Sequence, residues 1–262
     1  MKTTITSSAG NFTSSQIYRI CGTDTVMKTY LEEKKMETNL GRQLEQDKGS
    51  AASLWGTWMQ HRVTNVLLDT GIKPTKDERR IHPTITQWTG AEDYLREDSI
   101  GEVKCFELKK FCKAHDSASL GFDSLKKVCP EIAWQLVSNS ILNDKPKAEL
   151  TLYVPYKREL STIRDIDEWQ RILSAENFDN KVFQYWINSL SYKSDDELPY
   201  LLEGYHYPNL SNFTFDIKES DKKYLTERVE LAVKLINKCK KKTKWKKSQQ
   251  KKQSGYLFRQ KK

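Results

Sequence analysis

The feature of this sequence that most constrains its fold is a short apolar segment, residues 99–105, which reads SIGEVKC and carries two opposite charges. On a β-strand, successive side chains point to opposite faces of the sheet. Glu102 and Lys104 would therefore share one face, and Val103 and Cys105 the other. Such a pair is either a simple ion pair or a carboxylate metal ligand with a catalytic lysine beside it. The rest of the chain has to distinguish the two.

Helix and strand patterns alternate around this segment. Apolar residues at helical spacing predict helices at residues 12–22, 50–71, 131–142 and 220–238. The highly charged residues 28–47 are also expected to be helical. Apolar and β-branched runs predict strands at residues 84–95, 99–106 and 148–156. Between the second strand and the helix at 131–142 we expect a polar loop. This order predicts a mixed α/β (α+β) fold, with a mixed central sheet flanked by helices.

The charge distribution divides the chain into a folded body and a basic tail. From residue 238 onward the sequence holds 12 Lys/Arg and no acidic residue, so the total net charge of +9 leaves −3 on residues 1–237. We expect residues 1–237 to form a single domain, in which 161–219 is an insertion or subdomain. Residues 238–262 are typical of a disordered tail that attracts phosphate, or of one that merely aids solubility.

Several classes of protein are excluded by features that the sequence lacks. No apolar run approaches the roughly 18 residues of a membrane span, and no signal-peptide core is recognisable, so we expect a cytoplasmic protein with no membrane role. The five cysteines form no CxxC pair, which argues against a disulfide framework or a structural zinc site. Phosphate-binding loops, dinucleotide fingerprints and nucleophile elbows are also missing.

Asp93 precedes Glu102 by a short turn in the sequence. If the two predicted strands pair, both carboxylates can converge on one hard cation. Mg²⁺ favours a site of one or two carboxylates completed by waters and substrate phosphate oxygens. A cation of this kind lowers the pKa of bound water and neutralises phosphate charge. With Lys104 orienting the attacking water, these residues suit phosphodiester hydrolysis.

The order of short motifs adds to this interpretation. The chain reads FTSSQ, SLWGTWMQ, GAEDYL, GEVKC, AWQLV and LYVPY in succession. Over residues 13–158 and 221–237 this order resembles the PD-(D/E)xK nuclease superfamily, and within it the YqaJ-like phage recombinase branch that includes phage lambda exonuclease. The resemblance implies a restriction-endonuclease-like core.

The resemblance also assigns roles to individual residues. It implies that Asp93 and Glu102 bind Mg²⁺, with Mn²⁺ as an alternative ion and the Val103 carbonyl as a further ligand. Lys104 would position the nucleophilic water. Gln135 would stabilise Lys104 or the water from the neighbouring helix.

Two positions depart from the family pattern. Gln60 stands where the family often has a helical glutamate, and an amide is a poorer metal ligand than a carboxylate. His61 is the adjacent alternative, but successive helix residues lie about 100° apart and Gln60 flanks the apolar face, so Gln60 fits the cleft better. In the T-A-S-R-like motif Gln16 replaces the arginine. Ser15 is still in place as a DNA contact. Arg158, just past the last predicted strand, either contacts the DNA backbone or is simply exposed to solvent.

The resemblance implies a magnesium-dependent exonuclease that digests one strand of linear duplex DNA during phage-type recombination. It further implies 5′→3′ polarity, a ring-shaped homo-oligomer around the DNA ends, a single-strand annealing protein as partner, and a bacterial host cytoplasm as location. The alternative is a non-catalytic nucleic-acid-binding protein on a degenerate nuclease fold. Gln60 supports this alternative, whereas the intact Asp93, Glu102 and Lys104 oppose it.

Overall fold

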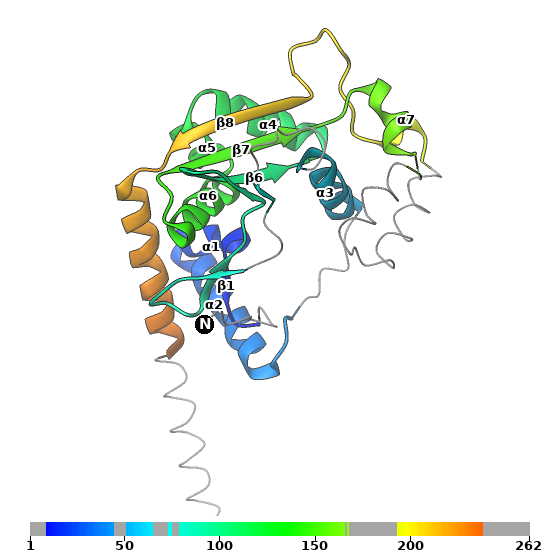
Figure 1. Ribbon diagram of the computed structural model, residues 1–262. Coiled ribbons are helices and arrows are strands. Elements are labelled where there is room, and N and C mark those ends of the chain that lie inside the picture. The colour runs from blue at the N-terminus through cyan, green and yellow to red at the C-terminus, as the bar shows by residue number, and fades with distance from the viewer. Residues whose placement is uncertain are drawn as a thin grey trace, which may run out of the picture.

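The computed structural model of the chain describes residues 9–44, 51–64, 73–74, 79–165, 167 and 193–237. Two sheets lie among helices in this part of the chain (Figure 1): a five-stranded sheet ordered β2-β5-β6-β7-β8 and a three-stranded sheet ordered β1-β4-β3. The predicted mixed α/β fold is confirmed. The predicted tail, and residues 166 and 168–192 of the 161–219 segment, lie outside the described residues, so the predicted domain boundaries stay predictions.

The strands are β1 (Phe12–Thr13), β2 (Lys73–Pro74), β3 (Arg80–Ile81), β4 (Trp88–Gly90), β5 (Tyr94–Leu95), β6 (Ser99–Lys104), β7 (Lys147–Tyr153) and β8 (Leu210–Asp216). The α-helices are α1 (Tyr18–Cys21), α2 (Asp24–Leu40), α3 (Ala51–Arg62), α4 (Leu108–Ser119), α5 (Phe122–Val128), α6 (Pro130–Asn143), α7 (Leu160–Ile163) and a helix over residues 219–237. Short 3₁₀ helices occur at η1 (Ser14–Gln16), η3 (Lys157–Glu159) and η4 (Asp195–Glu197). Strands β6 and β7 are parallel, whereas β5 and β8 run antiparallel to their neighbours.

The central strands β6 and β7 are buried on both faces, as parallel strands covered on each side usually are. Ile100 and Leu150 pack into a core that also contains the apolar faces of α4, α5 and α6. Val103 and Tyr153 point to the other face and pack with Trp58 of α3. The two faces of this sheet therefore meet different helices.

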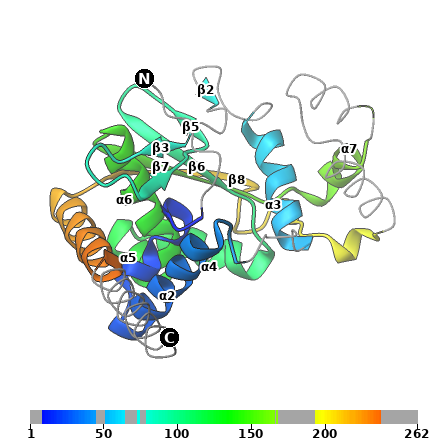
Figure 2. The ribbon, with the colours of Figure 1, turned by 90° about the horizontal axis from the view of Figure 1, so that it is seen from below.

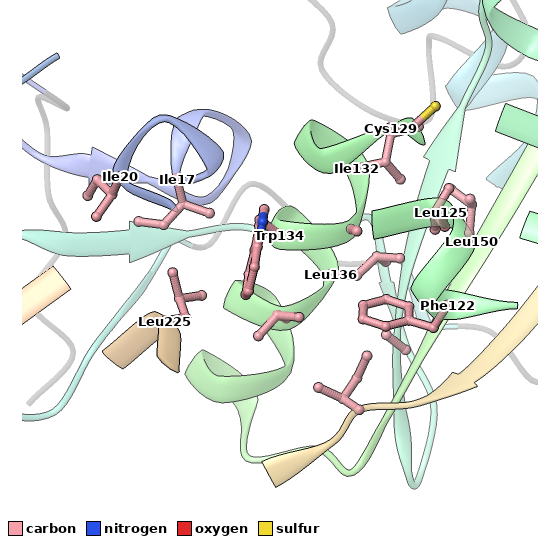
Figure 3. Close-up of a cluster of buried hydrophobic side chains, with 14 of the residues drawn as sticks. Ile17, Ile20, Phe122, Leu125, Cys129, Ile132, Trp134, Leu136, Leu150 and Leu225 are labelled. Atoms are coloured by element: carbon pink, nitrogen blue, oxygen red, sulfur yellow. The ribbon is translucent and has the colours of Figure 1, made fainter. Parts of the chain in front are cut away.

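Helix α6 lies at the centre of the larger core. It begins at Pro130, a favoured first helical residue, and ends before Asp144, whose φ is 51°. Figure 3 shows its Trp134 on the side towards Ile17 and Ile20, while Leu125 and Leu150 lie on the opposite side. Because Ser138, Asn139 and Ser140 of this helix are fully buried, their side chains must find partners inside the protein.

The helix predicted at the C-terminal end of the described chain is present, whereas the one predicted at residues 12–22 is replaced by β1, η1 and the short helix α1. Ile17 and Ile20 are fully buried, and α1 ends before Gly22. In the helix over residues 219–237, drawn in orange in Figures 1 and 2, the predicted apolar stripe faces inward. Its Arg228 donates from Nε to the carbonyl oxygen of Ile20 over 3.0 Å, which joins it to α1.

The prediction of a polar loop between β6 and α6 is wrong, because α4 and α5 occupy these residues. Helix α4 buries Phe111, Ala114 and Ala118 at intervals of three and four residues. Its charged residues obscured this stripe in the sequence. Strand β8 lies within the 161–219 segment, where the sequence pattern predicts no strand.

Other elements differ in their boundaries. The predicted strand at 84–95 is two strands: β4 pairs with β1 and β3, whereas β5 belongs to the larger sheet. Helix α2 ends at Leu40, where Gly41 takes a left-handed φ of 69°. Of the helix predicted at 50–71, the structure describes residues 51–64. None of the described helices is long and apolar enough to cross a membrane.

Candidate active site

The β5–β6 hairpin brings Asp93 and Glu102 to neighbouring strands. The main-chain N–H of Asp93 donates to the carbonyl of Gly101 over 3.0 Å, and Tyr94 pairs with Gly101 in the antiparallel register. The Asp93 carboxylate turns towards β6, where its Oδ2 accepts the Val103 N–H at 2.7 Å. The strand pairing on which the predicted convergence depends is therefore present.

Gly101 allows this close pairing. The Tyr94 ring lies directly across it, and a Cβ atom at position 101 would come within 2.0 Å of the ring carbon Cζ. A residue with a side chain at this position would push β5 away from β6. Asp93, the residue before Tyr94, would move with it.

Glu102 and Lys104 share one face of β6, as the alternation predicts. Lys104 Nζ donates to Glu102 Oε2 over 3.0 Å. The Glu102 side chain is 1% exposed, whereas that of Lys104 is 22% exposed. Val103 and Cys105 pack into the cluster on the opposite face. The carboxylate is thus held inside, whereas the lysine side chain is partly exposed.

Helix α6 supplies amide side chains to the same carboxylate. Gln135 Nε2 donates to Glu102 Oε2 over 2.8 Å. Asn139 Nδ2 donates to Glu102 Oε1 and also to the carbonyl oxygen of Ala91, the latter over 2.9 Å. Sequence reasoning singled out Gln135 and missed Asn139. The spacing of four residues, which puts both amides on one helix face, is the signal that could have found it.

Helix α3 reaches the site from the other face of the sheet. Gln60 Nε2 donates to Asp93 Oδ1. One turn earlier, a Cβ at Gly56 would lie 3.4 Å from the carbonyl oxygen of Cys105, so α3 packs closely against the end of β6. The side chain of His61, the alternative to Gln60, lies outside the described residues. Of the two alternatives, Gln60 is the one that the structure places in contact with a carboxylate of the candidate site.

The charges at the site are poorly balanced. Burial raises the pKa of Asp93. Burial and the nearby charge of Asp93 raise the pKa of Glu102 to about 7, although Lys104 opposes the shift. Burial lowers the pKa of Lys104, but the two carboxylates outweigh it and raise that pKa. Two carboxylates thus share one ammonium in a setting with little water.

This donor set fits a hard divalent cation. A dication would relieve the repulsion between Asp93 and Glu102, and carboxylate oxygens are the ligands that Mg²⁺ prefers. No cluster of three or more His, Cys, Asp or Glu side chains suited to a metal occurs within the described ranges. Two carboxylates would then be completed by waters or main-chain oxygens, as is usual for Mg²⁺. Val103 contacts Asp93 through its N–H, and its carbonyl as a ligand stays a prediction.

The two predicted DNA contacts lie on the surface. Ser15 is exposed, and its hydroxyl lies 3.4 Å from that of Thr13. The neighbouring Ser14 is buried, with its Oγ 2.7 Å from Ser138 Oγ on α6. Arg158 has a side chain that is 72% exposed and forms an ion pair with Glu203. The contacts of Ser15 and Arg158 with DNA stay predictions.

Three solved structures resemble the fold. LHK-Exo in complex with dAMP aligns with a TM-score of 0.62 at 13% identity, over 92% of this chain and 95% of that chain. A second structure of LHK-Exo, an alkaline exonuclease from Laribacter hongkongensis, gives 0.55 at 13% identity, over 90% and 94%. A phage-related exonuclease from Haemophilus somnus 129PT gives 0.58 at 16% identity, over 89% and 96%.

No protein-family model and no curated protein sequence matches the chain. The structural likeness spans nearly the whole of each protein, although the sequence identities are low. The chain therefore has the fold of these alkaline and phage-related exonucleases.

Proposed function

We propose that this protein is a metal-dependent DNA exonuclease of the PD-(D/E)xK type. The observation that carries the proposal is the pair formed by the half-buried Asp93 and the buried Glu102, whose charge Lys104 compensates only in part. The exonuclease fold supports it. Mg²⁺ is the proposed cofactor, with Mn²⁺ as an alternative.

The side chains divide the work of hydrolysis among them. A bound Mg²⁺ supplies Lewis acidity and lowers the pKa of bound water. Lys104, held by Glu102 but partly open to solvent, orients the attacking water and offsets phosphate charge. Gln135 donates to the same Glu102 oxygen as Lys104, so it supports the lysine through the carboxylate. Gln60 fixes the Asp93 carboxylate from the other face.

The substrate and the assembly follow from the resemblance. LHK-Exo binds dAMP, a deoxynucleotide, and we extend deoxynucleotide chemistry to this chain. We propose digestion of one strand from linear duplex ends in the 5′→3′ direction during phage-type recombination in the bacterial cytoplasm. A ring-shaped homo-oligomer and a single-strand annealing partner belong to the same proposal.

Digestion of end-labelled linear duplex DNA in Mg²⁺ tests the proposal. Wild type should release nucleotides stepwise, and faster from 5′-phosphorylated than from 5′-hydroxyl ends. Lys104→Ala should lower the rate by roughly 10²–10⁴-fold, the range typical of a positioned proton-transfer or charge-stabilising group. Lys147→Ala is the matched control, because Lys147 is also ion-paired on this sheet, with Asp98 at 2.8 Å. Equal rates for the two variants would contradict the assigned role of Lys104.

A non-catalytic DNA-binding protein is the second candidate, favoured by Gln60 and by the 12 Lys/Arg from residue 238 onward. That candidate predicts no digestion in Mg²⁺ or Mn²⁺, together with DNA binding that weakens steeply with salt. Deletion of residues 238–262 would then abolish the function. In the nuclease, the same deletion should weaken DNA affinity and leave the cleavage step intact.

A further inference from the structure

One buried amide that the proposed reaction does not yet use lies where the two carboxylate-bearing segments meet. Asn139 of α6 is fully buried. Its single Nδ2 atom donates to the Ala91 carbonyl oxygen and to Glu102 Oε1. Ala91 lies two residues before Asp93, so this amide joins the segment that carries Asp93 to the strand that carries Glu102.

The surroundings fix the orientation of this amide. Both partners of Nδ2 are acceptors, so the nitrogen must face them and the oxygen must point away. A Cβ atom at Gly90 would lie 2.4 Å from Asn139 Oδ1 and 2.0 Å from Ser14 Oγ, which shows how tightly the oxygen is enclosed. The amide therefore has no room to turn.

The same oxygen is costly for folding. Asn139 Oδ1 is buried and has no hydrogen-bond partner in the part of the chain that the structure describes. An unpaired buried acceptor lowers the stability of a fold. The two hydrogen bonds of Nδ2 therefore come with a loss at the oxygen of the same amide.

The two oxygens of Glu102 are used unequally. Oε2 accepts hydrogen bonds from Lys104 and Gln135, which fill its two lone pairs. Oε1 accepts a hydrogen bond from Asn139, which leaves one lone pair for another partner. Asn139 is thus bonded to the oxygen of Glu102 that still has capacity for a cation.

We infer that Asn139 is a positioning residue that sets the separation of Asp93 and Glu102 and aims Glu102 Oε1 at a divalent cation. This inference rests on the proposed function. Asn143, one turn further along α6, provides the comparison. It donates to Glu92 Oε2 over 2.9 Å, and Glu92 is outside the carboxylate pair.

Calorimetric titration of the metal-free full-length protein with Mg²⁺ or Mn²⁺ tests the inference without any substrate. Asn139→Leu should weaken ion affinity by about 10-fold or more, the range found when a partner of a metal ligand is removed. Asn143→Leu is the matched control. Its ion affinity should stay within about twofold of wild type, because Asn143 donates to Glu92 and not to the carboxylate pair. Asn139→Ala repeats the test if the leucine variant does not fold.

Thermal unfolding without metal separates positioning from folding. Asn139→Leu and Asn143→Leu should both remain folded at the temperature of the titration, yet only the former should lose ion affinity. Unchanged affinity in the folded Asn139 variants, or an equal loss in the Asn143 variant, would overturn the inference alone. Absence of ion binding to wild type would overturn the proposed metal site, and the inference with it.

Discussion

Two buried glutamates on neighbouring strands of the same sheet show how differently a protein can treat the same side chain. Glu149 of β7 is 5% exposed and Glu102 of β6 is 1% exposed. Glu149 accepts hydrogen bonds from Ser99 at 2.6 Å and from Tyr94, Arg96 and Asn212, each at 3.1 Å. Burial raises the pKa of Glu149, but these bonds and the charge of Arg96 outweigh burial and lower it.

Glu102 also has several donors, yet its pKa rises to about 7. Lys104, Gln135 and Asn139 all donate to it. The difference lies in burial and in Asp93, a second carboxylate that repels it. Glu149 forms an ion pair with Arg96 and accepts hydrogen bonds from its neighbours, so its charge is balanced. The Glu102 site, in contrast, keeps excess negative charge. We interpret that excess as the part of the site left for a cation.

The largest expected effect that separates the two glutamates is on DNA digestion. Glu102→Gln should lower the rate by roughly 10³-fold or more, because it removes a charged ligand from the centre where phosphate charge develops. Glu149→Gln should digest DNA at a rate within about threefold of wild type, because Glu149 lies outside the proposed metal site. A threefold change in rate corresponds to less than about 1 kcal/mol in the barrier. Initial rates on end-labelled duplex DNA measure both. Comparable losses in the two variants would break the distinction.

Stability should respond in the opposite sense. Glu149→Ala removes the shared acceptor of four side chains and should lower the free energy of unfolding by about 2–3 kcal/mol, with the loss moderated because Arg96 is partly exposed. Glu102→Gln removes a repulsion and should leave the metal-free protein as stable as wild type or more so at neutral pH. Urea unfolding in a chelator measures both values. A larger loss for Glu102→Gln would contradict the proposed difference.

The two glutamates should also give stability opposite dependences on pH. The pKa of Glu102 is raised from 4.5 to about 7, so its contribution is full below pH 4.5 and is lost as pH rises through about 7. The pKa of Glu149 is lowered from 4.5, so its contribution is present above pH 4.5 and is lost as pH falls through the lowered value.

Unfolding of the metal-free protein across this pH range measures both slopes. Glu102→Gln should reduce the loss of stability between about pH 5 and pH 8, whereas Glu149→Gln should reduce the loss on the acidic side. If the free energy of unfolding of both variants depends on pH as that of wild type does, other groups govern the pH dependence.

The smallest expected effect on stability comes from Tyr94, which lies between the Glu149 network and the Glu102 site. The Tyr94 hydroxyl donates to Glu149 and lies 2.9 Å from Thr151 Oγ1, while its ring covers Gly101. Tyr94→Phe keeps the ring and should lower stability by about 1 kcal/mol. DNA digestion should be unchanged, because the hydroxyl belongs to the Glu149 network. A clear loss of activity would show that the two regions are coupled through β5.

The geometry around Asp93, Glu102 and Lys104 could be anticipated because it depends on local spacing. Alternation along a strand fixes which side chains share a face, and a short turn brings the preceding carboxylate alongside. The helix α6 and the helix over residues 219–237 were equally accessible, since each has a clear apolar stripe.

Features that depend on tertiary packing could not be predicted in the same way. Helix α4 is rich in lysine, and its apolar face becomes evident only against the sheet. The chain changes sheets between β4 and β5, which no periodicity records. Asn139 is unremarkable in the sequence, and its role depends on Ala91 and Glu102 lying together.

The most direct test of the account is the change in thermal stability on adding Mg²⁺ to the metal-free protein at about pH 8, where Glu102 is largely ionised. An ion that binds only the folded state raises the midpoint of unfolding in proportion to the logarithm of its concentration. We predict such a rise for wild type and little or none for Glu102→Gln. No rise in wild type with Mg²⁺ or Mn²⁺, or an equal rise in both proteins, would contradict the claim that the charge of the Asp93 and Glu102 pair is left for a cation.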